Sequence, residues 1–208
     1  MNRRNVIILA IVLVSFIVSA CYYSQLPSRV ASHWDIQGQV NGYTSRFWGA
    51  FLMPVVILGL ALLFLAIPYI DPLRKNIEKF RKHFDLFVIL ILLFMLAIHL
   101  QTLLWNTGTQ IPLNATLPIG LGLLYFYIGV LFTHAKRNWF VGIRTPWTLS
   151  SEKVWDRTHR LGSKLFKISG VLSIVGVFFP GETMWFAVVP VLVSALYTTV
   201  YSYLIYRR

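Results

Sequence analysis

The chain has 208 residues, of which 57% are hydrophobic, 15% aromatic and 12% charged, and its formal net charge is +12. Soluble domains carry about 25% charged residues, so this composition excludes an ordinary soluble domain and indicates a membrane protein. The single cysteine, Cys21, excludes an internal disulfide and a multi-cysteine metal site.

Six apolar segments follow one another, each near the roughly 20 residues that a helix needs to cross a bilayer. They span approximately residues 5–25, 47–70, 86–105, 116–134, 162–180 and 184–206. Backbone groups in a bilayer must be hydrogen-bonded internally, and no segment alternates like a barrel strand. We therefore predict an all-α integral membrane protein with six transmembrane helices, forming a single membrane domain over residues 1–208. The first segment resembles a signal peptide but is long enough to be kept as a spanning helix.

The basic residues predict the orientation. Every Lys and Arg except Arg29 and Arg46 lies in the N-terminal tail, in segments 71–85 and 135–167, or at the C-terminus. The positive-inside rule then places both termini and both basic segments on the cytoplasmic side. We therefore expect a multi-pass protein of the bacterial cytoplasmic (inner) membrane. Because the charge lies beside anionic headgroups, we expect the lipid bilayer as partner and no direct nucleic-acid binding.

The predicted outer loop, residues 26–46, contains several turn formers. Pro27 ends the first helix, and Gly38 and the pair Asn41-Gly42 favour turns. The loop is therefore expected to form a short hairpin or an ordered cap on the outer face.

Three side chains of this loop, His33, Trp34 and Asp35, stand together before the first turn. We expect Trp34 at the membrane interface, Asp35 paired with Arg29 or Arg46, and His33 hydrogen-bonded to the loop backbone. A metal site is an alternative use of His33 and Asp35, with Glu182 as a third ligand. One histidine and two scattered carboxylates form a weak ligand set, so we predict no metal and no cofactor.

Polar residues within the spans are few. His99 and Gln101 lie in the outer half of the third span, and His99 is expected to reach interfacial water. Ser169, Gly170, Ser173 and Gly176 give the fifth span a small-residue surface for close helix packing. Before the third span, residues 71–85 are expected to form a short interfacial helix or an extension of that span.

The segment from Asn138 to Gly162 concentrates tryptophans, basic residues, acids and a histidine between two apolar spans. Contact with lipid accounts for the composition of the spans but not for that of this segment. Gly142 permits a tight turn, and Thr145-Pro146 imposes extended backbone before Trp147. A helix is predicted near 150–161 with Ser150 as N-cap, lying in the cytoplasmic interface and turning at Gly162 into the fifth span.

Two uses of this segment follow from its residues. In the structural use, Arg144 clamps Glu152 or Asp156 and the tryptophans anchor the loop. In the catalytic use, Arg144, Asp156 and His159 act on lipid headgroups, but the set has no nucleophile paired with a base. We therefore predict that the chain is not an enzyme and assign no catalytic residue.

The segment also resembles a known family. The run Gly142-Ile143-Arg144-Thr145-Pro146-Trp147-Thr148-Leu149-Ser150-Ser151-Glu152, followed by Val154-Trp155, Thr158-His159 and Gly162, is similar to the signature of the SdpI family of bacterial membrane immunity proteins. Residues 116–208 contain this signature region. Residues 1–70 resemble the N-terminal, DUF1648-like module of such proteins, through Leu26-Pro27, His33-Trp34 and Gly38.

The resemblance implies immunity to a secreted antimicrobial peptide, with capture of a cytoplasmic transcriptional repressor at the membrane. The residues it assigns to the partner or signalling loop are Asn138, Gly142, Arg144, Thr145, Pro146, Trp147, Glu152, Trp155, Asp156 and His159. Those it assigns to peptide contact are Pro27, His33, Trp34, Asp35 and Gly38. The alternatives are a small-molecule or lipid transporter and the headgroup enzyme.

Overall fold

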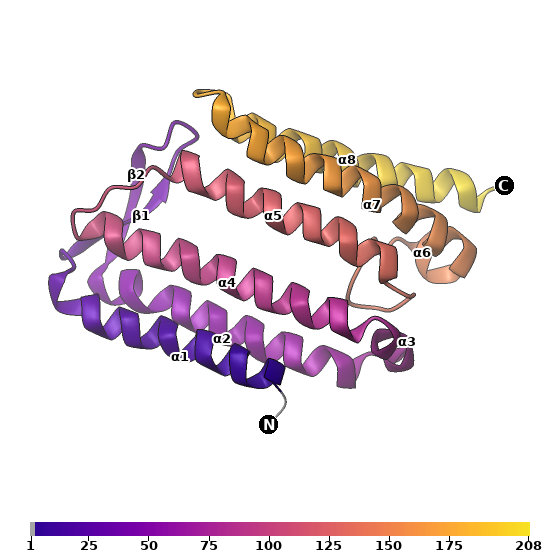
Figure 1. Ribbon diagram of the computed structural model, residues 1–208, viewed down its shortest axis with the longest axis horizontal. Helices are drawn as coiled ribbons and strands as arrows, with labels where there is room; N and C mark the ends of the chain where they lie inside the picture. The colour runs from indigo at the N-terminus through magenta and orange to yellow at the C-terminus, as the bar shows by residue number, and fades with distance from the viewer. Residues whose placement is uncertain (1–2) are drawn as a thin grey trace. The chain divides into compact units, whose positions relative to one another are not determined.

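A computed structural model describes residues 3–208, and within this range six helices are long and apolar enough to cross a membrane (Figure 1). This confirms the predicted all-α membrane fold. The six helices are α1 (Arg3–Tyr22), α2 (Arg46–Ile70), α4 (Arg81–Asn106), α5 (Leu113–His134), α7 (Glu152–Val175) and α8 (Thr183–Tyr206). The shorter elements are η1 (Tyr23–Gln25), β1 (Arg29–Trp34), β2 (Val40–Ser45), α3 (Arg74–Lys79), α6 (Pro146–Ser150) and η2 (Gly176–Phe178).

Helix α7 corrects one prediction. A helix covers the expected stretch near 150–161 as the first part of α7, but the predicted turn at Gly162 is wrong, because α7 continues without a break from Glu152 and is extended by η2 to Phe178. Gly162 serves packing instead, since a Cβ atom there would lie 2.6 Å from Ile143 Cδ1 and 3.2 Å from Phe132 Cδ2. A helix of 27 residues is about 40 Å long, so one end extends beyond a hydrocarbon core of about 30 Å.

The chain forms two compact units: residues 1–65 with 88–117, and residues 66–87 with 118–208. In the first unit, Leu26, Val30, Ala50 and Leu103 form a buried apolar cluster. Beside it, the Ser19 hydroxyl of α1 donates to the Ala50 carbonyl of α2. The same hydroxyl contacts His99 Nε2 of α4 at 2.8 Å. His99 is therefore buried between helices, and the expectation that it reaches interfacial water is wrong.

The loop after α1 is a hairpin, which is one of the two forms that the sequence predicted for it. Strands β1 and β2 pair antiparallel, and the turn between them places Gly38 at φ +81°. Asp35 Oδ1 accepts the backbone N–H groups of Gln37 and Gln39, each at 2.9 Å. The predicted turn at Gly38 is confirmed, whereas Gly42 lies within β2. Asp35 closes the turn, and among the described residues it forms no ion pair with Arg29 or Arg46, so that expected pairing is wrong.

In the second unit, α5 and α7 approach closely at glycines. A Cβ atom on Gly170 would lie 2.5 Å from the carbonyl oxygen of Gly122 and 2.6 Å from Phe126 N. Ser173 donates to the Pro118 carbonyl at 2.7 Å, and the Ser169 and Ser194 hydroxyls are 3.0 Å apart. The predicted small-residue face of the fifth span is therefore a helix-packing surface.

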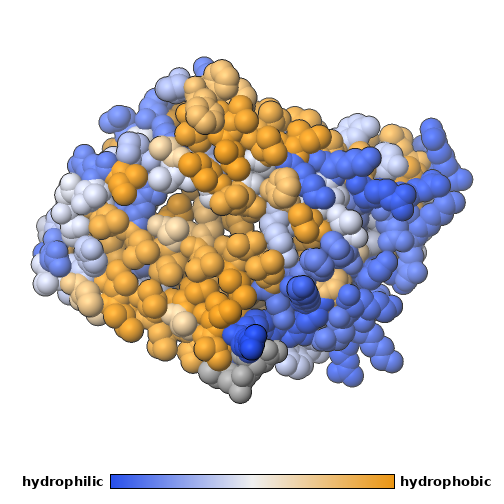
Figure 2. Space-filling model, viewed as in Figure 1, coloured by the Kyte–Doolittle hydropathy of each residue, from blue (hydrophilic) through white to orange (hydrophobic). Residues whose placement is uncertain are grey.

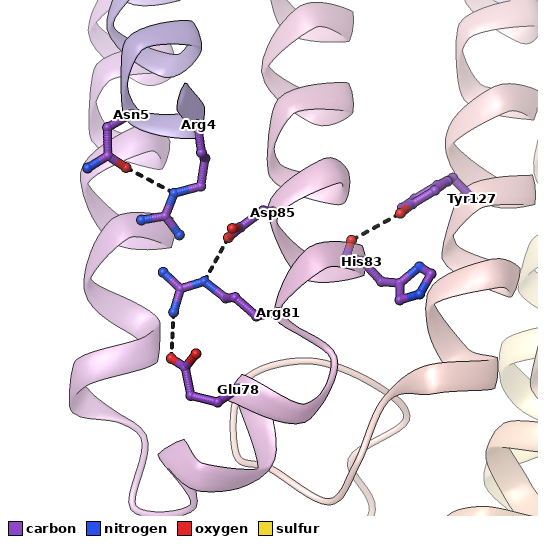
Figure 3. A network of polar contacts seen from close by, with 7 residues as sticks. All are labelled: Arg4, Asn5, Glu78, Arg81, His83, Asp85 and Tyr127. Carbon is purple, nitrogen blue, oxygen red and sulfur yellow. Dashed lines mark hydrogen bonds and ion pairs between the residues drawn. The ribbon is translucent and has the colours of Figure 1, made fainter. Parts of the chain in front are cut away.

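The start of α4 is fixed by charges outside the apolar part of the helix. Arg81 bonds Glu78 at 2.7 Å and Asp85 at 2.8 Å, and Tyr127 donates to the His83 carbonyl (Figure 3). Ile77, Phe80 and Phe84 are buried beneath this network. Residues 71–85 thus supply both a short helix, α3, and an extension of the third span.

The surface separates into apolar and polar zones. Hydrophobic residues cover α1 on the face shown in Figure 2, whereas hydrophilic residues gather around α3 and α6. On α8, Leu192, Val193 and Leu196 are exposed. Exposed apolar helix faces of this kind are what a bilayer solvates.

We expect Gly170→Ala to lower the free energy of unfolding by about 1–3 kcal/mol, because the new methyl group overpacks the α5–α7 contact. Gly59→Ala on α2 is the matched control, since its Cβ would meet nothing within 4 Å. Unfolding in mixed detergent micelles measures both variants. Equal stability of Gly170→Ala and Gly59→Ala would contradict the close packing.

Candidate functional site

The segment between α5 and α7 is a loop whose backbone is held by buried side chains. Asn138 is 0% exposed, and its Oδ1 accepts the N–H groups of Phe140 and Val141 at 3.0 and 2.7 Å. Its Nδ2 donates to the carbonyls of Lys136 and Val141, both at 2.8 Å. One amide therefore satisfies four backbone groups of the loop that follows α5.

His159 and Trp155 form the support on which this loop rests. Their rings stack with centroids 3.9 Å apart, and Trp155 Nε1 donates to the Ala135 carbonyl at the end of α5. His159 is 2% exposed and accepts the Ile143 N–H on Nε2 at 3.0 Å. Its Nδ1 lies 2.8 Å from the Trp155 carbonyl. A backbone N–H only donates and a carbonyl only accepts, so the ring is neutral with its proton on Nδ1.

Gly142 crosses directly above this pair of rings. Its φ is +122°, and a Cβ atom would lie 2.5 Å from His159 Nε2 and 3.0 Å from Trp155 Cη2. The predicted tight turn is confirmed, and the close approach to the rings adds a second reason for glycine.

After Gly142 the loop forms the short helix α6. Thr145 is its N-cap and accepts the Thr148 N–H, while Thr148 Oγ1 accepts the Thr145 N–H, which makes a capping box. Pro146 occupies the first turn. Thr145 also contacts the Ser202 hydroxyl at 3.0 Å, and Trp147 packs on Tyr203, so α6 is joined to α8.

Two predictions for this segment are wrong. Arg144 does not clamp an acid, because it is exposed and its Nη1 donates to the Trp139 carbonyl at 2.7 Å. Glu152 is instead 3.8 Å from Arg137. Ser150 is not the N-cap of the following helix, since α7 starts one residue later and Ser151 accepts the Val154 N–H.

Sequence reasoning missed Asp71 as part of this site. Asp71 is 2% exposed, and its two oxygens accept the N–H groups of Leu73 at 2.6 Å and of Trp139 at 2.9 Å. Asn76 donates to the Arg137 carbonyl in the same region. The Asp-Pro pair signals a turn, but nothing local in the sequence indicates a partner 68 positions away.

A polar cleft of about 160 Å³ opens where these segments meet. Its lining combines basic and acidic groups with one buried ring: Asn76, Lys79, Lys136, Arg137, Glu152, Trp155 and Asp156. Within residues 3–208, Arg137 Nε is one of the buried side-chain atoms without a hydrogen-bond partner. The loop therefore presents charged side chains at this cleft, while buried side chains hold its backbone.

The hairpin residues assigned to peptide contact have structural neighbours as well. His33 Nδ1 bonds the Asn41 side chain rather than the loop backbone, and Trp34 packs edge-on against Trp105 at 5.7 Å. The Pro27 carbonyl lies 3.5 Å from Arg46 Nε. Within residues 3–208, no three His, Cys, Asp or Glu side chains gather as metal ligands.

Six spanning helices, an ordered hairpin and a braced basic loop define a multi-pass membrane protein. Comparison with known proteins identifies which one it resembles. Residues 134–202 match the SdpI/YfhL protein family, and residues 10–58 match a domain of unknown function, DUF1648. The immunity protein SdpI of Bacillus subtilis (strain 168) is 28% identical over 207 residues, covering 99% of this chain and 97% of that protein. No solved structure matches the chain.

The chain is therefore similar to the SdpI family in residues 134–202, as the loop motif predicted, and is a multi-pass protein of the bacterial cytoplasmic membrane. The family match covers the loop, α6, α7 and most of α8, and the DUF1648 match covers the hairpin. Both stretches that the sequence singled out thus lie in matched regions.

Gly142→Ala is expected to destabilise the protein more than Gly181→Ala. Both glycines have positive φ, so each variant carries backbone strain of about 1–3 kcal/mol. Only Gly142→Ala also forces a methyl group against His159, because Gly181 has nothing within 4 Å of its Cβ position. Thermal unfolding of both variants in detergent measures the difference. Equal losses would show that the loop does not rest on the two rings.

Proposed function

We propose that this protein is a bacterial membrane immunity protein that protects its cell against a secreted antimicrobial peptide. The observation that carries the proposal is the similarity to the immunity protein SdpI over 99% of the chain. The geometry of the loop supports a role other than catalysis. His159 uses both ring nitrogens within the fold, so in the set Arg144, Asp156 and His159 the histidine has no free nitrogen to act as a base.

The proposed orientation follows the basic residues: the hairpin faces outward and the loop between α5 and α7 faces the cytoplasm. The peptide then meets the hairpin, with Pro27, His33, Trp34, Asp35 and Gly38 in or near the contact. For binding to become a signal, the peptide must bind two conformations of the protein with different affinity. The polar groups within the spans support signalling over transport. Ser19, His99 and Ser169 bond to neighbouring helices and therefore serve helix packing.

The cytoplasmic side of the proposal is the capture of a transcriptional repressor. Lys153, Arg157, Arg160 and Lys164 are all exposed on α7. Their spacing of four, three and four residues puts them on one helix face. Trp139 and Arg144 are exposed on the adjoining loop. We call these four residues of α7 the basic stripe, and it complements an acidic surface on the repressor. The hydrogen-bonded loop beside α7 keeps Trp139 and Arg144 in a fixed conformation next to the stripe.

Immunity is tested by complementation. A Bacillus subtilis strain that lacks its own SdpI is exposed to the culture medium of the toxin-producing parent, with and without this protein. We expect the protein to restore survival, measured as colony-forming units. Unchanged killing, at expression confirmed by immunoblot of membranes, would contradict the proposed immunity.

Repressor capture is tested by reversing charge on the stripe. Arg157→Glu with Arg160→Glu is expected to reduce co-purification of DNA-binding proteins from Bacillus subtilis membranes at least about tenfold, because opposite charges become like charges. Arg74→Glu with Lys75→Glu is the matched control, since it makes the same charge change at exposed positions of α3. Equal recovery with both double variants would argue against the stripe as the docking surface.

A further inference from the structure

The first unit contains a half-open cavity of about 490 Å³ beneath the hairpin, which lies within the roughly 300–1,000 Å³ typical of ligand sites. The hairpin contributes Ser32, Tyr43 and Thr44 to its lining. Helices α2 and α4 contribute the other lining residues, most of which are apolar: Trp48, Gly49, Leu52, Met53, Val56, Met95, His99 and Thr102. None of these is among the residues assigned above to peptide contact.

The cavity opens along α2. Trp48, Leu52 and Val56 are four residues apart, so they lie on one helix face, and all three are exposed. The mouth is therefore an apolar stripe on a spanning helix, beside the first turn after the hairpin. An apolar ligand lying in the outer part of the bilayer can reach it without crossing a polar surface.

One edge of the hairpin is covered. Asn106 at the end of α4 accepts the Ala31 N–H at 2.7 Å and donates to the Ala31 carbonyl at 3.0 Å. Both backbone groups of Ala31 therefore point away from β2. The Asn106 side chain thus occupies the outer edge of β1 and makes the two hydrogen bonds that a neighbouring strand would make there.

The other edge is free at Tyr43. In an antiparallel pair, opposed residues direct their backbone groups either both toward each other or both outward. Ala31 is paired with Tyr43, so the N–H and C=O of Tyr43 point outward from β2. The Tyr43 side chain is 55% exposed, and Tyr43 also lines the cavity. An unpaired donor and acceptor on a strand edge thus lie beside an apolar cavity.

The cavity lining also contains one nearly buried histidine, His99. The Ser19 hydroxyl gives its proton to the Ala50 carbonyl at 2.6 Å, so His99 Nε2 must donate to Ser19 Oγ. The neutral ring then keeps an unprotonated Nδ1.

We propose that the β2 edge and this cavity dock an extended, uncharged, apolar segment of the antimicrobial peptide. The segment adds a strand to β2 through the backbone of Tyr43, and alternate side chains enter the cavity. The inference rests on the proposed function. A lipid acyl chain also fits an apolar cavity, but it has no backbone amides to pair with Tyr43, so the free edge favours a peptide.

The test measures binding to the full-length protein in detergent by titration calorimetry. The probe is acetyl-Thr-Leu-Thr-Phe-Thr-amide, and the matched probe carries N-methyl groups at Leu and Phe, which block strand pairing. Tyr43→Pro removes the outward N–H without removing a ladder bond to β1, whereas Tyr43→Ala keeps the backbone and removes only the ring. Met53→Trp fills the cavity.

We expect wild type and Tyr43→Ala to bind the probe. Tyr43→Pro, Met53→Trp and the N-methylated probe are each expected to weaken binding at least about tenfold. Equal binding by the N-methylated probe, or by Met53→Trp with an unchanged unfolding midpoint, would overturn the proposal. Displacement of the probe by phosphatidylglycerol, with normal binding in Tyr43→Pro, would assign the cavity to an acyl chain instead.

The complementation assay separates this inference from the proposed function. If wild type protects cells and Tyr43→Pro and Met53→Trp protect them equally, the docking site is wrong and immunity stands. If the probe binds with the expected variant pattern but wild type fails to protect, the docking site stands and the proposed immunity fails.

Discussion

A backbone amide at the edge of a bilayer must find an acceptor, and for Ile143 that acceptor is a histidine ring. His159 fills the role only as the neutral ring with its proton on Nδ1, which the Trp155 carbonyl and the Trp155 ring hold in place. Trp155 in turn donates to the end of α5. Together with Asn138 and Asp71, this ring fixes the position of the loop, and its closeness adds to the need for glycine at position 142.

The residues of this segment fall into two groups: those that hold the loop backbone and those that are exposed. The residues that make the family signature recognisable, among them Gly142, Trp155 and His159, are occupied in holding backbone. Other residues of the segment, such as Arg144, Arg157 and Arg160, are exposed, and these are the ones that the proposed partner would meet. A signature of this kind identifies a fold element, and the chemistry of partner recognition then lies on the surface that the element supports.

The six spans were predictable, because hydrophobic length is set by bilayer thickness and needs no tertiary information. The turn at Gly38 was predictable from local turn chemistry. The partner of Arg144 and the role of Asp71 were not, because both depend on backbone groups brought close by folding. The break expected at Gly162 arose from reading glycine as a turn former, whereas the chain uses it there to let Phe132 and Ile143 approach α7. The hairpin register and the Asn106 contact that leave Tyr43 unpaired were likewise invisible in the sequence.

The protonation of His159 tests this account most directly. Nitrogen-15 NMR of histidine-labelled protein in lipid bilayers distinguishes the two neutral tautomers from each other and from the charged ring. The account predicts a neutral His159 with Nδ1 protonated and Nε2 hydrogen-bonded as an acceptor. A ring protonated on Nε2, in either the neutral or the charged form, would contradict it, because Nε2 could then not accept the Ile143 N–H.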